Sequence, residues 1–141
     1  MPKIIIADTS CFIALTNIDE LDLLQKTYGE IITTIEVAAE YGQTLPKWVE
    51  IKVVANKNLQ QVLELQIDKA ESSAIASAME TPNCTIIVDN YKARKVAEKL
   101  GLEITGTIGV ILKAKLRGVI PSVKPYLNKL IQSGFHLSEQ V

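Results

Sequence analysis

The sequence predicts an α/β protein, built as a three-layer α/β/α sandwich around a mostly parallel sheet of about five strands. Short apolar segments typical of buried strands alternate with helical segments along the 141-residue chain. The connections between them are short, which favours strands that lie side by side and run parallel. No internal repeat, low-complexity tract or linker interrupts this order. We therefore expect a single domain over residues 1–141.

Two segments are the clearest strand candidates. Residues 3–7 and 84–88 are short apolar runs rich in isoleucine, as expected for strands buried on both faces of a parallel sheet. Shorter strands are expected at residues 31–32 and 102–104. Apolar and charged residues alternate over residues 49–53, which predicts a half-exposed strand at an edge of the sheet.

Helices are expected in the segments between and after these strands, many of them bounded by capping residues, glycine or proline. One helix start carries a specific signal: Thr33 followed by Glu36 matches a capping box, which gives Glu36 a role at the start of its helix. The expected helical segments are residues 12–15, 21–28, 33–42, 59–65, 70–79, 91–100, 107–117 and 121–133.

Composition excludes several classes of protein. No run of about 18 apolar residues occurs, and Asp8 interrupts the apolar start, so we expect a cytoplasmic protein without a membrane span or secretory leader. Cys11 and Cys84 lie in apolar surroundings and are expected to be core thiols. The single histidine, His136, excludes a His-rich zinc site and argues against a Ser-His-Asp triad. Catalysis should therefore rest on carboxylates.

Charge is distributed unevenly although the net charge is −1. Residues 1–70 carry six lysines and ten acidic residues, whereas residues 71–141 carry nine basic and six acidic residues. Basic side chains in the second half can neutralise phosphates, and the alternative is that they only solvate helix faces. They include Lys92, Arg94, Lys95, Lys99, Lys113, Lys115 and Arg117.

Asp8 and Asp89 directly follow the two most apolar strand candidates. Ligand sites of open α/β sheets form at the carboxyl ends of the strands, so the two carboxylates face one crevice if their strands are neighbours. The alternative for each is a helix N-cap. Because Thr9, Ser10 and Asn90 are able to cap without a buried charge, a shared function is the better interpretation.

Two further acids are expected at the same edge of the sheet. Glu71 lies in the first turn of a helix with small residues on its inner face, and its alternative role is interaction with the helix dipole. Glu36 and Glu40 lie one turn apart on another helix. Since the capping box already accounts for Glu36, we prefer Glu40 as the fourth acid.

Four carboxylates without histidine or cysteine form an oxygen-rich site that suits Mg²⁺ or Mn²⁺ and suits zinc poorly. Such acids repel one another, so their clustering is explained by a cation that neutralises them. Water activated by the ion would then attack a phosphodiester. On this interpretation, replacing Asp8 or Asp89 by asparagine should leave the metal-free protein at least as stable as the wild type.

These residues resemble the PIN-domain family, and more closely a PIN-like prokaryotic branch related to the VapC toxin ribonucleases. The resemblance covers nearly the whole chain. The matching stretches are Ile6-Ala7-Asp8-Thr9-Ser10, Val37-Ala38-Ala39-Glu40, Asp68-Lys69-Ala70-Glu71-Ser72-Ser73-Ala74-Ile75, Val88-Asp89-Asn90 with Ala93-Arg94, and the tail Ile104-Thr105-Gly106-Thr107-Ile108-Gly109-Val110 with Lys113-Ala114-Lys115 and Gly118.

The resemblance implies a PIN-like five-stranded parallel sheet, cleavage of single-stranded RNA with Mg²⁺ or Mn²⁺, a homodimer, and for toxins an antitoxin protein that blocks the site. Carried onto this sequence, the catalytic and metal-binding residues are Asp8, Glu40, Glu71 and Asp89. The expected substrate-binding residues are Thr9, Ser10, Asn90, Lys92 and Arg94. Arg94 is expected to bind a phosphate through two of its oxygens, and the alternative is an ion pair that anchors the helix of Arg94.

The alternatives to a nuclease are a signalling receiver domain and a non-catalytic binding module. A signalling receiver domain normally has an acid pair after the first strand and a lysine after the last strand, and neither is present at Asp8-Thr9 or at Ile104-Thr105-Gly106. A non-catalytic PIN-like module that binds RNA or protein remains the alternative, although all four acids are present.

Overall fold

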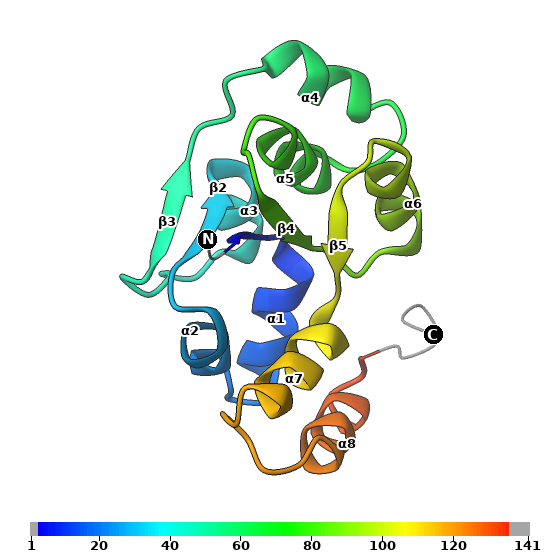
Figure 1. The fold of residues 1–141 in the computed structure, drawn as a ribbon. Coiled ribbons are helices and arrows are strands. Elements are labelled where there is room, and N and C mark those ends of the chain that lie inside the picture. The colour runs from blue at the N-terminus through cyan, green and yellow to red at the C-terminus, as the bar shows by residue number, and fades with distance from the viewer. Residues whose placement is uncertain (1–2, 136–141) are drawn as a thin grey trace.

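The computed structural model describes residues 3–135, which fold into a five-stranded parallel sheet between layers of helices (Figure 1). The strand order is β3-β2-β1-β4-β5, and each neighbouring pair is parallel. The predicted fold class is confirmed. The strands are β1 (Ile4–Ala7), β2 (Ile31–Thr34), β3 (Val49–Lys52), β4 (Cys84–Ile87) and β5 (Glu103–Thr105).

The two most apolar strands form the centre of the sheet. β1 pairs with β4 from Ile4 opposite Cys84 to Ala7 opposite Ile87. The backbone N–H of Asp8 continues this ladder by donating to the carbonyl of Ile87 at 3.0 Å. The condition for a shared crevice is therefore met, because the two strands are neighbours, and the strand predicted at an edge is the edge strand β3.

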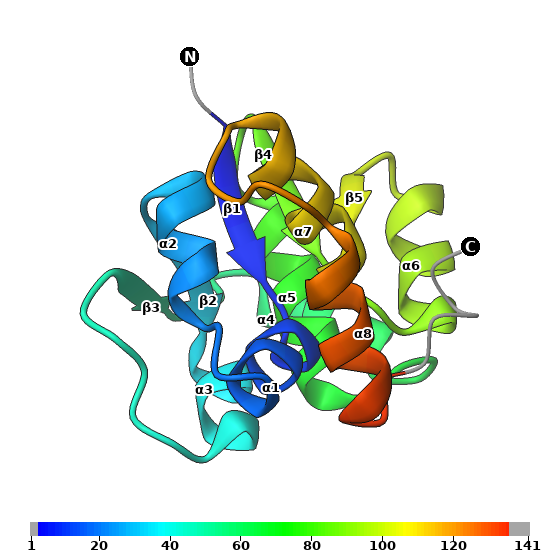
Figure 2. The ribbon, with the colours of Figure 1, turned by 90° about the horizontal axis from the view of Figure 1, so that it is seen from below.

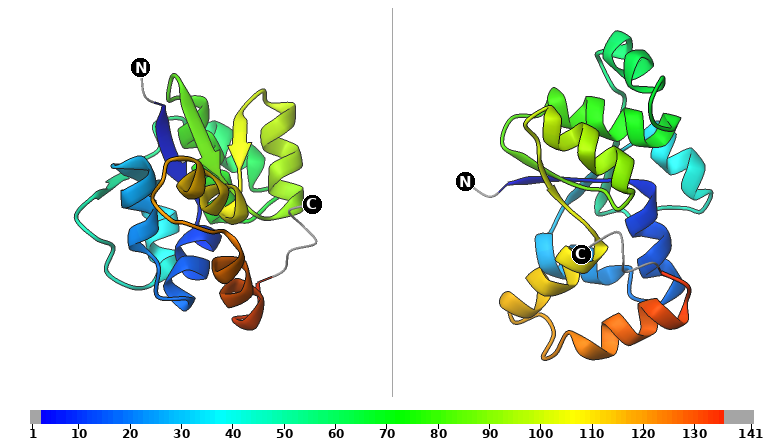
Figure 3. Two further views of the ribbon diagram at one scale, coloured as in Figure 1. Left: turned by 60° about the horizontal axis from the view of Figure 1, so that its bottom comes forward. Right: turned by 90° about the vertical axis from the view of Figure 1, so that its right-hand side faces the viewer.

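Helices cover both faces of the sheet. On one side lie α3 (Ile35–Tyr41), α4 (Lys57–Leu63), α5 (Lys69–Met79) and α6 (Tyr91–Lys99), with α5 packed against the three central strands (Figure 3). On the other side lie α1 (Thr9–Asn17), α2 (Asp22–Tyr28), α7 (Thr107–Leu116) and α8 (Lys124–Gln132), which stand in front of the sheet in Figure 2. None of the helices within residues 3–135 has the length and apolar character needed to cross a membrane.

The capping box predicted at Thr33 and Glu36 is wrong by one residue. β2 extends through Thr34, and the hydroxyl of Thr33 donates to the carbonyl of Ala7 in β1 at 2.7 Å. Thr34 is the N-cap of α3 and accepts the backbone N–H of Val37 at 3.1 Å. The cross-strand bond holds Thr33 in the sheet, so the helix starts one position later and Glu36 loses its predicted role.

The cysteine predictions hold for one thiol and in part for the other. Cys11 is fully buried in the core, whereas Cys84 at the start of β4 is half-buried, and both are free thiols. His136 lies outside the described residues.

Candidate active site

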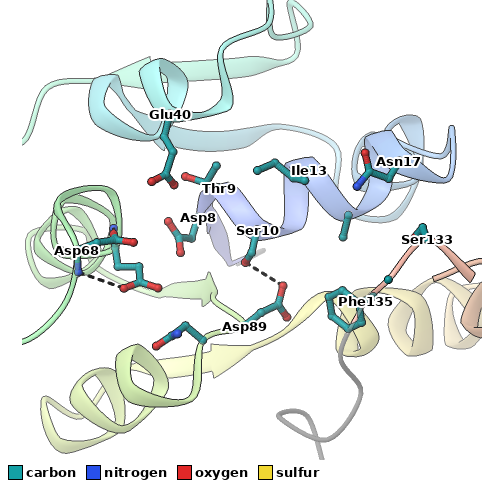
Figure 4. Close-up of a pocket in the computed structure, with 14 residues that line it drawn as sticks. Asp8, Thr9, Ser10, Ile13, Asn17, Glu40, Asp68, Asp89, Ser133 and Phe135 are labelled. Atoms are coloured by element: carbon teal, nitrogen blue, oxygen red, sulfur yellow. Dashed lines mark hydrogen bonds between the residues drawn. The ribbon is translucent and has the colours of Figure 1, made fainter. Parts of the chain in front are cut away.

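A pocket of about 410 Å³, here called the acid pocket, opens at the carboxyl ends of β1 and β4 (Figure 4). Its walls come from α1, α3, the start of α5, the β4–α6 connection and the segment that follows α8. It brings together all four acids predicted from the sequence. The lining residues are Asp8, Thr9, Ser10, Ile13, Ala14, Asn17, Glu40, Asp68, Glu71, Asp89, Asn90, Ser133, Gly134 and Phe135.

Asp8 occupies the N-cap position of α1, but its side chain does not cap the helix. The carboxylate is 3% exposed, and its Oδ1 has no hydrogen-bond partner within residues 3–135. Burial, together with the charges of Glu71, Asp68 and Glu40, raises the pKa of Asp8 to about 8. The helix-cap interpretation does not account for this acid, because an unsatisfied buried carboxylate oxygen is costly.

Asp89 is also buried, but it is held by hydrogen bonds. Its carboxylate accepts the hydroxyl of Ser10 at 2.9 Å and the backbone N–H and hydroxyl of Thr107 at 2.7 and 2.6 Å. Gly106, the N-cap of α7, has no side chain to cap that helix, so Asp89 caps it from β4. The cap of its own following helix is Asn90, which accepts the N–H of Ala93 at 3.0 Å.

Asp89 is therefore a helix cap, although for α7 and not for the helix that follows it in sequence. The reason lies in the parallel sheet, where the ends of β4 and β5 are adjacent and the start of α7 meets the end of β4. Asp89 is a structural residue as well as a candidate ligand.

Glu71 belongs to a capping box that sequence reasoning overlooked. Asp68 is the N-cap of α5 and accepts the backbone N–H of Glu71 at 2.7 Å, while Glu71 accepts the N–H of Asp68 at 3.3 Å. Burial raises the pKa of Glu71, and the neighbouring charge of Asp68 adds to the shift. Asp68 therefore joins the acid pocket, and the Asp-x-x-Glu spacing was the signal that would have identified it.

The structure distinguishes Glu40 from Glu36. Glu40 turns its carboxylate toward Asp8 and Thr9 (Figure 4). Glu36 is not among the lining residues of the acid pocket and lines only a neighbouring pocket of about 300 Å³, which Glu40 also borders. There Glu36 accepts the side-chain amide of Gln60 at 2.8 Å and lies 3.5 Å from Lys57 Nζ. Although the two glutamates are one turn apart, Glu40 is the one that lies among the other acids.

A hydrogen bond between two hydroxyls fixes the relative position of α3 and α5, the helices that carry Glu40 and Glu71. Thr34 Oγ1 at the start of α3 lies 2.7 Å from Ser73 Oγ in α5, and both atoms are buried. This hydrogen bond joins the N-cap of α3, the helix that carries Glu40, to the first half of α5, two residues after Glu71. Their carboxylates thus project into the acid pocket from a braced pair of helices.

The acids fit a divalent cation held by few protein ligands. Along the described part of the chain, no three acidic, histidine or cysteine side chains come close enough to form a ready-made metal centre. Mg²⁺ usually binds through one or two carboxylates, completed by water and substrate phosphates. The unpartnered Oδ1 of Asp8, surrounded by further carboxylates, fits that mode of binding.

The expected substrate-binding residues fall into two groups. Thr9, Ser10 and Asn90 line the acid pocket. Lys92 and Arg94 lie on α6 and are not among its lining residues. Arg94 Nη1 donates to the carbonyl of Val88 at 2.9 Å, so the side chain anchors α6 through a backbone carbonyl rather than through the ion pair considered above.

Several lining residues were missed from the sequence. Ile13, Ala14 and Asn17 continue the helical spacing from Ser10, so one face of α1 was recognisable, but nothing local shows that it faces the acids. The approach of residues 133–135 depends on how α8 packs on α1 and carries no sequence signal.

A parallel α/β sandwich with acids gathered at the carboxyl ends of its central strands has the architecture of a nuclease-type fold. In agreement with this, a family model described as PIN domain matches residues 4–141. The chain therefore belongs to the PIN-domain family. Comparison with curated proteins and with solved structures gave no significant match.

Proposed function

We propose that this protein is a divalent-metal-dependent endoribonuclease that cleaves single-stranded RNA. The observation that carries the proposal is Asp8 Oδ1, a buried carboxylate oxygen without a hydrogen-bond partner in residues 3–135, inside a pocket lined by other acids. A buried acid whose pKa is raised to about 8 is costly to ionise unless a cation binds beside it.

The proposed metal-binding acids are Asp8, Glu40, Glu71 and Asp89, which would hold Mg²⁺ or Mn²⁺ either directly or through its bound water molecules. A bound ion of this kind polarises the phosphodiester and makes water a stronger nucleophile at neutral pH. The protein contributes the geometry. Ser10 and Thr107 fix the orientation of Asp89, while the bond between Thr34 and Ser73 braces the helices of Glu40 and Glu71.

Polar groups at the rim of the acid pocket are proposed to hold the RNA backbone. Ser10 and Asn90 line the pocket, and the buried hydroxyl of Thr9 has no hydrogen-bond partner in the described structure. The basic helix α6 begins immediately after Asn90, so Lys92 and Arg94 are placed to attract the phosphates that enter the pocket.

The cellular role that we propose is that of the toxin in a toxin–antitoxin pair, acting in the cytoplasm as a homodimer. Its support is the resemblance to the VapC-related branch together with the open position of the acid pocket. An antitoxin protein would act by covering this pocket.

The decisive experiment measures cleavage of a labelled single-stranded RNA in Mn²⁺ and in EDTA. The wild type should cleave only with the metal, and Glu40→Gln should lower cleavage by roughly 100-fold, as removal of an important electrostatic group does. Glu36→Gln is the matched control, because Glu36 lies one turn away and outside the acid pocket. Equal cleavage in EDTA would refute a metal mechanism, and RNA binding without cleavage would identify a binding module.

A further inference from the structure

The acid pocket has a second, apolar side that the proposed metal chemistry does not use. α1 supplies Ile13 and Asn17, which lie one turn apart and are both exposed. The ring of Phe135 lies across from this face, between Asp89 and Ser133 (Figure 4). One cavity therefore joins carboxylates to an aromatic ring, an aliphatic side chain and an amide.

A capping motif determines the position of Phe135. Gly134 adopts a positive φ of 97° just after α8 and donates its N–H to the carbonyl of Ile131 at 3.1 Å. Phe135 donates its N–H to the carbonyl of Leu130 at 2.9 Å. These two bonds form a Schellman motif, which turns the chain back toward the helix it has just left.

The helix that carries this motif is itself attached to the pocket wall. α8 packs against α1, and Lys129 Nζ lies 3.4 Å from Glu20 Oε2 just beyond the end of α1. Leu130 is fully buried, and Phe135 is half-buried against the core. The exposed part of the ring is thus presented to the pocket from a folded element.

We propose that Phe135 and Ile13 form a base-binding subsite, in which an unpaired nucleobase of the substrate stacks on the Phe135 ring. Asn17, with an amide donor and acceptor, would hydrogen-bond the edge of that base. The proposal rests on the proposed nuclease function of the same pocket, because the phosphate next to the stacked base would lie at the acids. It identifies the substrate as a strand with an unstacked base at the cleavage site.

Physical principles favour a nucleobase as the occupant. Bases stack well on aromatic side chains, and the contact tolerates any base because each has a π face. A base within a duplex is already stacked and paired, so it does not enter the pocket unless it is flipped out. The subsite therefore accounts for selection of single-stranded RNA by the pocket itself.

The structural alternative is that Phe135 serves only the apolar contact that accompanies a Schellman motif, here with Leu130. Phe135→Leu distinguishes the two roles, because leucine keeps an apolar contact and lacks an aromatic face. Phe135→Tyr retains the ring. Tyr126→Leu is the matched control, since it removes an aromatic ring that lies outside the pocket, on the helix α8 that precedes Phe135.

The test uses short single-stranded RNAs that carry the fluorescent base 2-aminopurine at successive positions, with Ca²⁺ replacing Mn²⁺ to slow cleavage. Stacking on Phe135 should quench the fluorescence at one position in the wild type, in Phe135→Tyr and in Tyr126→Leu. Phe135→Leu should lose this quenching and bind the RNA roughly tenfold more weakly, as expected for one lost base stack. Its melting temperature and its stabilisation by Mn²⁺ should match those of the wild type.

Wild-type quenching and affinity in Phe135→Leu would overturn the subsite, as would equal quenching with a duplex of the same sequence. A large fall in the melting temperature of Phe135→Leu, with quenching kept, would assign the ring to the fold alone. Failure of the proposed function has a different signature. Quenching that depends on Phe135 in a protein that does not cleave RNA would retain the subsite and refute the nuclease.

Discussion

The carboxylate of Asp89 accepts the backbone N–H of Thr107 at 2.7 Å, so the acid that follows β4 also caps α7. Asp8 directly follows the neighbouring strand β1, yet its Oδ1 has no hydrogen-bond partner within residues 3–135. The two aspartates are similar in sequence context but differ in how the fold satisfies their carboxylates.

Substitution by asparagine should therefore affect the two sites in opposite directions. In EDTA, Asp8→Asn should melt at or above the wild-type temperature, because it removes a buried group that is costly to ionise. Asp89→Asn should lower the free energy of unfolding by about 2 kcal/mol, since the amide nitrogen cannot accept the hydrogen bonds that the hydroxyls of Ser10 and Thr107 donate. Thermal unfolding of the three proteins measures both effects. Equal melting temperatures for the two variants would contradict the contrast.

The stability of the metal-free protein should depend on pH through Asp8. Its pKa rises from 3.8 to about 8 on folding, so between these values the unfolded chain releases a proton that the folded protein keeps. The free energy of unfolding should then fall as pH rises, by at most about 1.4 kcal/mol per pH unit, and level off above pH 8. Urea denaturation in EDTA between pH 5 and about 9 measures this slope.

Asp8→Asn provides the reference for the pH series, because it lacks the titrating carboxyl. The difference between wild type and variant isolates Asp8 from the other acids of the pocket. Parallel pH profiles for the two proteins would show that Asp8 ionises normally in the folded state.

Mn²⁺ should raise the melting temperature of the wild type, since the folded protein binds the ion and the unfolded chain binds it poorly. At an ion concentration about 100 times the Kd, the free energy of unfolding should increase by about 2.7 kcal/mol. Mn²⁺ should stabilise Asp8→Asn much less, whereas it should stabilise Glu36→Gln as much as the wild type, because Glu36 lies outside the acid pocket. Melting curves with EDTA and with Mn²⁺ test this. Equal shifts in all three proteins would place the ion elsewhere.

Lys92 and Arg94 should differ in how their loss affects RNA binding. Lys92 is exposed on α6, so Lys92→Ala should weaken RNA binding and leave the melting temperature unchanged. The slope of the logarithm of the binding constant against the logarithm of the salt concentration should become smaller by about one. Arg94→Ala should also destabilise the protein by about 1 kcal/mol, because it removes the hydrogen bond to the carbonyl of Val88.

Binding titrations at several salt concentrations, with melting curves of the same variants, separate these roles. Unchanged RNA affinity in Lys92→Ala would remove α6 from the substrate path. An Arg94→Ala protein with wild-type stability would show that its bond to Val88 contributes little to the fold.

Local patterns in the sequence predicted most of the fold. The isoleucine-rich runs became β1 and β4, because burial on both faces of a sheet requires apolar residues throughout a strand. The alternating segment became the edge strand β3, but the predicted half-burial is wrong, since Val49 is buried and Ile51 is 48% exposed. The prediction of a helix cap at Thr33 is wrong because the local sequence pattern does not show the hydrogen bond between Thr33 and the neighbouring strand. Thr33 and Thr34 are both able to cap a helix, and Thr34 becomes the cap because the Thr33 hydroxyl donates to the carbonyl of Ala7.

The sequence by itself determined the residue types available for chemistry: acids after apolar strands, no zinc ligand set, and a basic helix after Asn90. Tertiary structure alone decided which of them meet. Pairing of β1 with β4 brought Ser10 to Asp89, which is 79 positions away, and pairing of β4 with β5 brought Thr107 to the same carboxylate. Packing of α8 on α1 carried Phe135 to the acids. Periodicity reports how a residue is buried within its own element, whereas contacts between distant elements depend on the packing of the whole core.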